Sequence, residues 1–212
     1  MFDGILFDLD GTLWDATPVM AEVWAQVLSR HPEVSRPPVG LEEIRGNMGL
    51  LLDEIEVRMF PDQSEAERRA VTDEFCAMEE EYLATRGGVL FSGTEEILTA
   101  LAEKYRLFIV SNCQDGYIEC FYRGNGLERF FSGHECAGRT GLPKSGNIKL
   151  VAERYGLKNP VYIGDTVLDC SSAQEAGVPF LHAAYGFGQV PGASYVTAFD
   201  QIPAALEAMS PP

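Results

Sequence analysis

The feature that most constrains the fold is a short apolar run near the start of the chain that ends in acidic residues. Ile5, Leu6 and Phe7 form the run, and Asp8 and Asp10 follow it. An apolar run without polar alternation is typical of a strand buried on both faces, as in a parallel sheet covered by helices. Parallel strands of an open α/β sheet present the groups at their carboxyl ends to a ligand crevice. We therefore expect Asp8 and Asp10 to lie in a binding site at that edge.

The two carboxylates predict a cation at this edge of the sheet. Carboxylates so close together repel each other unless a cation or a shared proton relieves the repulsion. Hard oxygen ligands of this kind suit Mg²⁺, which keeps several waters and often bridges to a substrate phosphate. Gly11 and Thr12 come next, and backbone N–H groups in a glycine-containing turn can form an anion-binding nest. The stretch thus predicts a site for Mg²⁺ and phosphate.

Two later stretches repeat the pattern of an apolar run that ends in polar residues. Residues 107–110 lead to Ser111 and Asn112, and residues 161–163 lead through a glycine to Asp165. Segments with helical spacing of apolar residues alternate with these runs after the second glycine of a Gly-Gly pair. The alternation predicts an α/β fold whose core is a Rossmann-like, doubly wound parallel sheet.

The stretch between the first two predicted strands is helical. Apolar residues recur at helical spacing over residues 19–28 and 71–82, and no strand pattern interrupts them. A crossover between parallel strands does not need so long a segment. We therefore predict two domains, in which residues 1–14 and 88–212 form the α/β core and residues 15–87 form an inserted, all-helical domain.

Four motifs in this order resemble those of the haloacid dehalogenase-like (HAD) superfamily. They are Asp8-x-Asp10-Gly-Thr after the first strand, Ser111 at a strand end, Lys144 after a proline at a helix start, and Gly-Asp-x-x-x-Asp, which ends at Asp169. The resemblance covers essentially the whole chain. It is strongest to the helical-capped phosphatases of the phosphoglycolate phosphatase type, and it implies that the helical insert is a cap over the active site. In the alternative, the insert is a helical decoration without substrate contact.

The resemblance implies a role for each catalytic residue. Asp8 would be the nucleophile that becomes phosphorylated, which is a form of covalent catalysis. Asp10 would protonate the leaving oxygen and then deprotonate the hydrolytic water. Ser111, Asn112 and Lys144 would hold the phosphoryl oxygens, and a lysine can offset the charges of nucleophile and substrate together.

The same resemblance implies a set of metal ligands. Asp8, the backbone carbonyl of Asp10, and Asp165 would hold Mg²⁺. Asp169 would hold a metal-bound water or Lys144, and it is also a candidate N-cap for the helix that follows. Both roles for Asp169 can coexist.

One loop of the helical insert is the candidate for substrate selection. Residues 45–49 read Arg-Gly-Asn-Met-Gly, and we expect this loop to face the site. The guanidinium of Arg45 would bind a carboxylate or a second phosphate on the leaving group. In the alternative, the loop is an ordinary turn between helices.

Other phosphate and metal chemistries have less support. Residues 138–145 come close to a P-loop, Gly-x4-Gly-Lys-Ser, but Pro143 lacks the N–H and the φ freedom that this loop requires. The three histidines, His31, His134 and His182, stand apart in the sequence. A histidine-based zinc site or a Ser-His-Asp triad is therefore not indicated.

Charge and composition limit the partners. The chain has 212 residues, with 16 Lys and Arg against 32 Asp and Glu, which gives a formal net charge of −16. This acidity disfavours a nucleic-acid role. No apolar run approaches a membrane span, and the N-terminus lacks a signal pattern. The five scattered cysteines favour reduced thiols and a cytoplasmic location. The expected partner is a small phosphorylated metabolite, and no pattern indicates an oligomeric state.

These observations predict a Mg²⁺-dependent phosphatase that acts on a small phosphate monoester through an aspartyl-phosphate. A phosphomutase of the same superfamily would carry the same motifs, so that alternative stays open. A haloacid dehalogenase would not be expected to keep the metal-binding acids. A non-enzymatic phospho-receiver domain needs neither Asp10 directly after the acceptor nor a cap.

Overall fold

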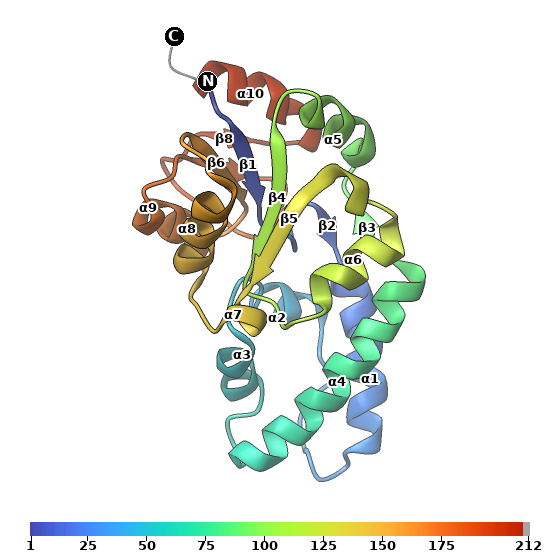
Figure 1. Cartoon of the computed structure of the whole chain (residues 1–212). Helices are drawn as coiled ribbons and strands as arrows, with labels where there is room; N and C mark the ends of the chain where they lie inside the picture. Colours follow the sequence, from blue (N-terminus) through green and yellow to red (C-terminus); the bar gives the residue numbers. More distant parts are fainter. Residues whose placement is uncertain (210–212) are drawn as a thin grey trace.

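The computed structural model describes residues 1–209, and its centre is a parallel sheet. Within these residues six strands form one sheet in the order β5-β4-β1-β6-β7-β8, and every neighbouring pair is parallel (Figure 1). The first strand, β1, lies near the middle, so the chain winds outward from it in both directions. This is the predicted doubly wound α/β fold. The strands are β1 (Gly4–Phe7), β4 (Arg106–Ser111), β5 (Phe131–Cys136), β6 (Pro160–Gly164), β7 (Phe180–Ala183) and β8 (Tyr195–Val196).

Helices cover both faces of the sheet, which explains the apolar runs. Leu6 belongs to a core cluster that contains Ile148 of α8 (Lys144–Tyr155) and Ala173 of α9 (Val167–Ala176). Its neighbours Ile5 and Phe7 belong to the core on the other face. That face is covered by α5 (Thr94–Ala102), α6 (Tyr117–Asn125) and α10 (Ile202–Met209), with the short α7 (Ala137–Thr140), η1 (Glu128–Phe130) and η2 (Phe199–Gln201) between elements.

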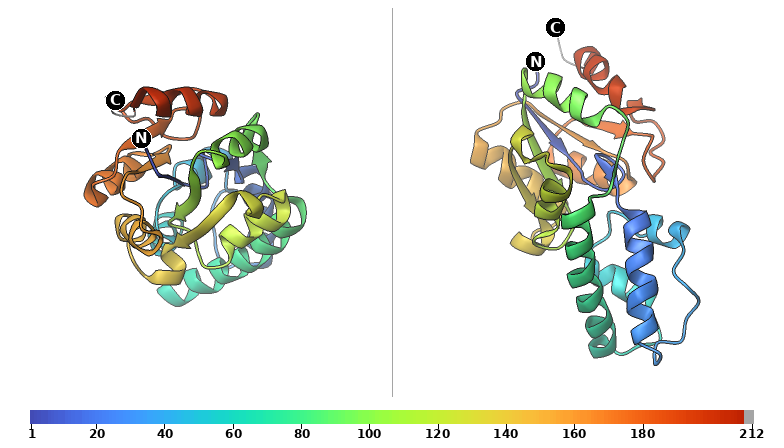
Figure 2. Two further views of the ribbon diagram at one scale, coloured as in Figure 1. Left: turned by 45° about the horizontal axis from the view of Figure 1, so that its top comes forward. Right: turned by 90° about the vertical axis from the view of Figure 1, so that its right-hand side faces the viewer.

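The predicted helical insertion is present between the first and second strands of the main sheet. It consists of α1 (Thr17–Arg30), α2 (Leu41–Arg45), α3 (Leu52–Met59) and α4 (Glu65–Arg86). Figure 2 shows the two long helices, α1 and α4, side by side at one end of the molecule. The ring of Trp24 on α1 stacks on that of Phe75 on α4, with 3.9 Å between the ring centroids. Ser64 caps α4 and forms a capping box with Glu67.

A short antiparallel ribbon joins the insertion to the core, and the sequence pattern did not reveal it. β2 (Trp14–Asp15) pairs with β3 (Val89–Leu90). Two residues a strand are too few to show an alternating pattern. Asp15, which we had placed in an all-helical segment, therefore lies in this ribbon. We propose residues 15–87 as the extent of the helical cap, with the ribbon at its base.

None of the helices within the described residues is both long and apolar enough to cross a membrane.

Candidate active site

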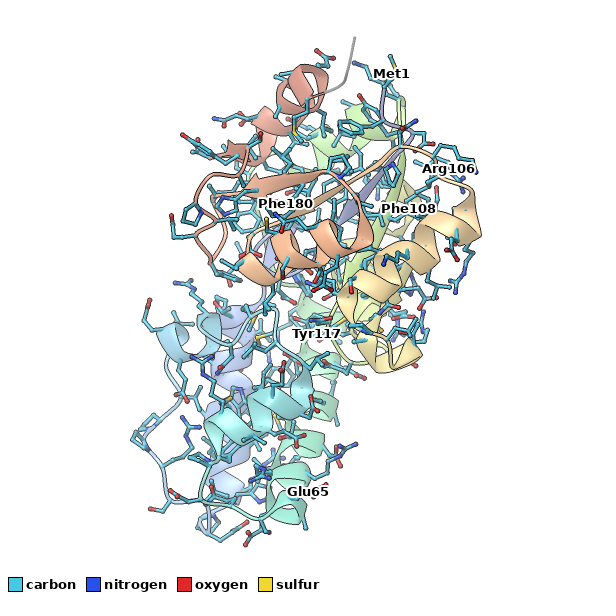
Figure 3. All side chains as sticks on the ribbon, turned by 90° about the vertical axis from the view of Figure 1, so that its left-hand side faces the viewer. Met1, Glu65, Arg106, Phe108, Tyr117 and Phe180 are labelled. Atoms are coloured by element: carbon cyan, nitrogen blue, oxygen red, sulfur yellow. The ribbon has the colours of Figure 1, made fainter. Side chains whose placement is uncertain are left out.

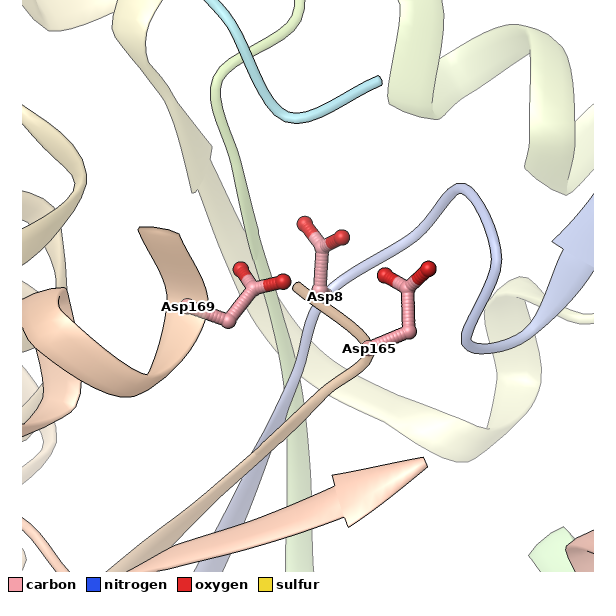
Figure 4. Close-up of side chains that lie close together, drawn as sticks. All are labelled: Asp8, Asp165 and Asp169. Atoms are coloured by element: carbon pink, nitrogen blue, oxygen red, sulfur yellow. The ribbon is translucent and has the colours of Figure 1, made fainter. Parts of the chain in front are cut away.

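Three buried acids meet at the carboxyl ends of two neighbouring strands. Asp8 follows β1 and Asp165 follows β6, and these strands are paired in parallel with Phe7 opposite Ile163. Asp169 reaches the same point from the first turn of α9. Figure 4 shows the three carboxylates grouped together, and each offers an oxygen within 4.8 Å of the others. A carboxylate cluster of this kind, buried from solvent, requires positive charge.

The hydrogen bonds of the three acids distinguish free ligand atoms from occupied ones. Asp165 Oδ2 accepts from the N–H of Phe187 at 2.7 Å, whereas its Oδ1 is buried without a hydrogen-bond partner. Burial, together with the charges of Asp169 and Asp8, raises the pKa of Asp165 well above its usual range. A free, desolvated carboxylate oxygen is what a hard divalent cation needs. The buried acids are therefore compatible with a hard divalent cation such as Mg²⁺.

Asp169 has both of its oxygens occupied. Oδ1 accepts from Lys144 Nζ at 2.6 Å, and Oδ2 accepts from the N–H and the hydroxyl of Thr166 at 2.9 and 2.6 Å. Thr166, not Asp169, is the N-cap of α9, and Asp169 completes the capping box as its third helical residue. Asp169 is thus suited to position Lys144 and the helix, and it is less suited to bind a metal directly.

Lys144 provides the buried positive charge of the cluster. It is the first residue of α8, as the sequence predicted, and it is 2% exposed. Its ammonium donates to Asp8 Oδ1 at 2.9 Å as well as to Asp169. Burial alone would lower the pKa of Lys144, but the charges of Asp169 and Asp8 outweigh it and hold the pKa above its usual range. Lys144 therefore stays charged and fixes one oxygen of Asp8.

Asp10 lies beside this cluster in a different environment. The indole N–H of Trp14 and the hydroxyl of Tyr117 both donate to its Oδ1 at 2.9 Å. Burial and the charge of Asp8 raise the pKa of Asp10 to about 7. Because Oδ1 receives both donors, Oδ2 is the oxygen available to carry a proton. A carboxyl group with this pKa can give and take a proton near neutral pH.

Trp14 and Tyr117 were not identified from the sequence as site residues. Both are almost fully buried, and their rings meet edge to face at 5.8 Å. Figure 3 shows Tyr117 where the sheet meets the helical insertion. Large aromatic residues next to a turn are ordinary core residues by pattern, so only the fold reveals that their polar atoms orient Asp10.

A cavity of about 90 Å³ lies between the sheet and the insertion, and Asp8 and Asp10 form part of its wall. The core also contributes Ser111, Asn112, Cys113, Gln114 and Tyr117. The insertion contributes mainly apolar side chains, among them Met20, Trp24, Ile44, Met59 and Phe75, together with Glu79. The helical insertion therefore covers the candidate site, and it leaves room for only a small ligand beside the acids.

Ser111 and Asn112 both reach this cavity, as the sequence predicted. Ser111 ends β4, the strand next to β1, and its Oγ accepts only a long contact of 3.4 Å from the N–H of Cys113. The side-chain amide of Asn112 instead donates to the carbonyl of Gly49 in the insertion at 2.8 Å. Ser111 therefore lines the cavity beside Cys113, while the side-chain amide of Asn112 joins the cap loop to the core.

Gly11 and Thr12 shape the site rather than offer their N–H groups to a ligand. The N–H of Gly11 donates to the carbonyl of Trp14 at 2.9 Å, and that of Thr12 donates to the carbonyl of Leu9 at 3.2 Å. Neither residue is part of the cavity wall. The two N–H groups are thus occupied within the turn, whereas the hydroxyl of Thr12 is buried without a partner; substrate binding by these residues stays a prediction. Gly11 has a φ of +78°, and a Cβ there would collide with the carboxylate of Asp165.

Gly11→Ala is therefore expected to impair the site. The added methyl group must displace Asp165, and an alanine at this φ is strained by about 1 kcal/mol or more. We expect a lower melting temperature and a higher Mg²⁺ requirement for activity. The control is Gly192→Ala, which has a φ of +82° but open space around the new Cβ. Equal effects of the two substitutions would mean that backbone strain, not the collision with Asp165, matters.

Arg45 does not line the cavity. Its guanidinium donates to Asp15 Oδ2 at 3.0 Å and lies 5.7 Å from the ring centroid of Phe187. Asn47, two residues further on, faces the cavity and is 3% exposed. The predicted loop is thus next to the cavity, while Arg45 itself lines a separate hollow together with Asp15 and Phe187.

Glu79 is a further site residue that sequence reasoning missed. It lies on α4 of the insertion, is 2% exposed and is part of the cavity wall. Burial and the charge of Asp10 raise the pKa of Glu79 well above its usual range. A signal was present in the sequence, because Phe75, Glu79 and Leu83 follow each other at four-residue spacing and all three are buried. Acidic residues are rarely fully buried, so an acid within the apolar face of a helix indicates a binding or catalytic role.

Fold and site together define a class of protein: a capped α/β hydrolase with paired acids and a buried lysine at the carboxyl ends of its strands. Comparison with known proteins gives the family. Residues 5–183 match the model of the haloacid dehalogenase-like hydrolase family, and the chain belongs to that family.

Curated relatives in this family are phosphatases. A plasmid-encoded phosphoglycolate phosphatase of Cupriavidus necator is 27% identical over 97% of this chain and 90% of its own length. A phosphoglycolate phosphatase of Xylella fastidiosa is 29% identical over 86% of this chain and 80% of its own. The predicted resemblance to this type is confirmed, and so is the enzyme class, phosphoric monoester hydrolase.

Solved structures confirm the fold. A predicted phosphoglycolate phosphatase from Haemophilus somnus superposes with a TM-score of 0.83 at 23% identity, over 99% of this chain and 98% of its own. A haloacid dehalogenase-like hydrolase from Streptococcus pneumoniae gives a TM-score of 0.83 at 21% identity, over 97% and 98%.

Proposed function

We propose that this protein is a Mg²⁺-dependent phosphatase that hydrolyses a phosphate monoester of a small molecule through an aspartyl-phosphate on Asp8. One observation carries the proposal. Lys144 fixes Oδ1 of Asp8, and the buried Oδ1 of Asp165 beside it has no partner. The ammonium of Lys144 holds the nucleophile, and the free oxygen of Asp165 can bind Mg²⁺. Together, two positive charges at this point would reduce the repulsion between Asp8 and a dianionic phosphate ester.

The first half of the reaction uses Asp8 and Asp10. Lys144 holds Oδ1 of Asp8, so Oδ2 is the oxygen that would attack phosphorus. As the new bond forms, the ester P–O bond breaks and the leaving oxygen takes the proton of Asp10. Ser111 and Lys144 would hold the phosphoryl oxygens. Mg²⁺ held by Asp8, Asp165 and the Asp10 carbonyl would neutralise phosphoryl charge and favour in-line displacement.

The second half restores the enzyme. Asp10, now a carboxylate, takes a proton from a water molecule, and the resulting hydroxide attacks the phosphorus of the aspartyl-phosphate. The bond between Asp8 and phosphorus breaks, and inorganic phosphate leaves. The donors Trp14 and Tyr117 keep Asp10 in place through both steps. A pKa of about 7 allows Asp10 to act as acid and base in turn.

The test is phosphate release from small esters with and without EDTA. We expect activity to disappear with EDTA and to return with excess Mg²⁺. Release of inorganic phosphate, rather than of an isomeric phosphate ester, separates a phosphatase from a phosphomutase. Failure of every ester to yield phosphate in the presence of Mg²⁺ would contradict the proposal.

Asp165→Asn is expected to raise the Mg²⁺ concentration for half-maximal activity by about tenfold or more. The amide removes a charged ligand, and even loss of a supporting contact around a metal costs roughly 10- to 100-fold in affinity. Asp200→Asn, at an exposed position, is the matched control for loss of charge. An unchanged midpoint in Asp165→Asn would reject this residue as a metal ligand.

The five cysteines of the chain are all free thiols. This fits the proposal that the enzyme acts in a reducing compartment such as the cytoplasm.

A further inference from the structure

The cavity that would receive the leaving group has no cation in its wall. Among the described residues that line it, none is lysine or arginine. Lys144 lies against Asp8 and Asp169 and is not part of this wall. Arg45 is paired with Asp15 outside it. An anionic leaving group would therefore enter the cavity without a partner of opposite charge, and a buried, unpaired charge is costly.

An adjoining surface hollow does contain an arginine. Arg69 lines that hollow together with residues 51–53. Its side chain is 68% exposed and lies 3.6 Å from the carboxylate of Asp73. A solvated, paired guanidinium of this kind offers little binding energy to a leaving group inside the cavity.

The cavity wall contains an unsatisfied acid instead. Glu79 Oε2 accepts from the side-chain amide of Gln114 at 3.0 Å. Oε1 is buried and has no hydrogen-bond partner within residues 1–209. A buried carboxyl oxygen without a partner costs free energy unless a ligand supplies a donor. Glu79 and Asp10 both line this cavity, so a positive group bound between them would be attracted to both carboxyl groups.

The rest of the wall is apolar and aromatic. Trp24, Phe75 and Tyr117 all line the cavity, and the first two are stacked on each other. Aromatic faces attract ammonium groups, and they do so more strongly where water is excluded. Methionines at positions 20, 48 and 59 complete an apolar lining. An acid surrounded by aromatic and aliphatic groups is complementary to an alkyl ammonium ion.

We propose that the substrate is the phosphate monoester of a small amino alcohol, whose ammonium group binds Glu79 while its carbon skeleton lies against the aromatic wall. The proposal rests on the phosphatase function proposed above and names the substrate class of the same site. It differs from the substrate in the names of the curated relatives, because the alcohol part of phosphoglycolate carries a carboxylate. It also replaces our expectation that Arg45 binds an anionic leaving group.

Three two-carbon phosphate esters test the proposal, because they differ only in the group that would reach Glu79. O-Phosphoethanolamine carries an ammonium, ethyl phosphate a methyl, and phosphoglycolate a carboxylate. Steady-state phosphate release with Mg²⁺ gives kcat/KM for each. We expect the ammonium ester to exceed ethyl phosphate by about 10- to 100-fold, as for a hydrogen bond to a charged group, and phosphoglycolate to be the poorest.

Glu79→Gln should reduce the preference for the ammonium ester over ethyl phosphate by about tenfold or more. The amide oxygen can still accept from Gln114, so the variant changes charge with little change of shape. Glu81→Gln removes the same charge from an exposed position two residues along α4 and is the control. We expect it to keep the wild-type ratio.

The wild-type series decides the question even if Glu79→Gln does not fold. Preferred hydrolysis of phosphoglycolate, or equal rates for all three esters, would overturn the amino alcohol proposal and leave the phosphatase function standing. An ammonium preference that is unchanged in folded Glu79→Gln would overturn the role of Glu79. If neither these esters nor a generic aryl phosphate released phosphate, the proposed function would fall and the inference with it.

Discussion

Asp8→Asn is expected to abolish phosphate release while the protein stays folded. The amide has nearly the shape of the carboxylate, and its oxygen can still accept from Lys144, which lies 2.9 Å from Asp8. It is a very poor nucleophile, and no other group is positioned to attack phosphorus. Loss of a catalytic nucleophile costs roughly 10⁴-fold or more in turnover. Phosphate release by purified protein with saturating Mg²⁺ measures the effect.

The stability of Asp8→Asn provides an independent readout. Burial and the charge of Asp169 raise the pKa of Asp8 to about 6 when no metal is bound. In the metal-free protein the buried negative charge of Asp8 therefore costs free energy of folding. The neutral amide of Asp8→Asn does not carry that cost. We expect the melting temperature without Mg²⁺ to be at least as high as that of the wild type, while stabilisation by Mg²⁺ is lost. Turnover near the wild-type rate in the folded variant would refute the mechanism.

Lys144→Ala is expected to remove both activity and much of the stability. The substitution leaves Asp8 and Asp169 buried without the ammonium that contacts both, at 2.9 and 2.6 Å. Removing one partner of a buried ion pair costs about 3–5 kcal/mol, because the remaining charge is uncompensated. Turnover should fall because the variant no longer fixes the nucleophile or offsets the charge of the phosphoryl group. Urea unfolding and phosphate release measure the two effects.

Lys149→Ala is the matched control for this change. Lys149 lies on the same helix, α8, but is exposed. We expect its substitution to change the free energy of unfolding by less than about 0.5 kcal/mol. If Lys144→Ala behaved like Lys149→Ala in both measurements, Lys144 would be a surface-type lysine without a role in the site.

The sequence by itself determined the fold class and which polar residues lie together at one edge of the sheet. Apolar runs such as residues 5–7 lack polar alternation, which is typical of strands in a sheet covered by helices on both faces. The polar residues that follow the runs, Asp8, Ser111 and Asp165, lie at the same edge of that sheet. This worked because both signals are local: the run specifies burial, and the residue that follows it specifies what is presented to the crevice. The position of Lys144 after a proline is likewise a local helix-start signal.

The tertiary structure alone decided which residues line the cavity beside the acids. Glu79 is far in sequence from every motif, and it lines the same cavity as Asp10 only because α4 packs across the carboxyl ends of the strands. Arg45 pairs with Asp15, which belongs to a two-residue ribbon too short for any pattern to reveal. Sequence periodicity tells which face of a helix is buried. It does not tell what that face is buried against, and that contact determines whether the cavity favours a cation or an anion.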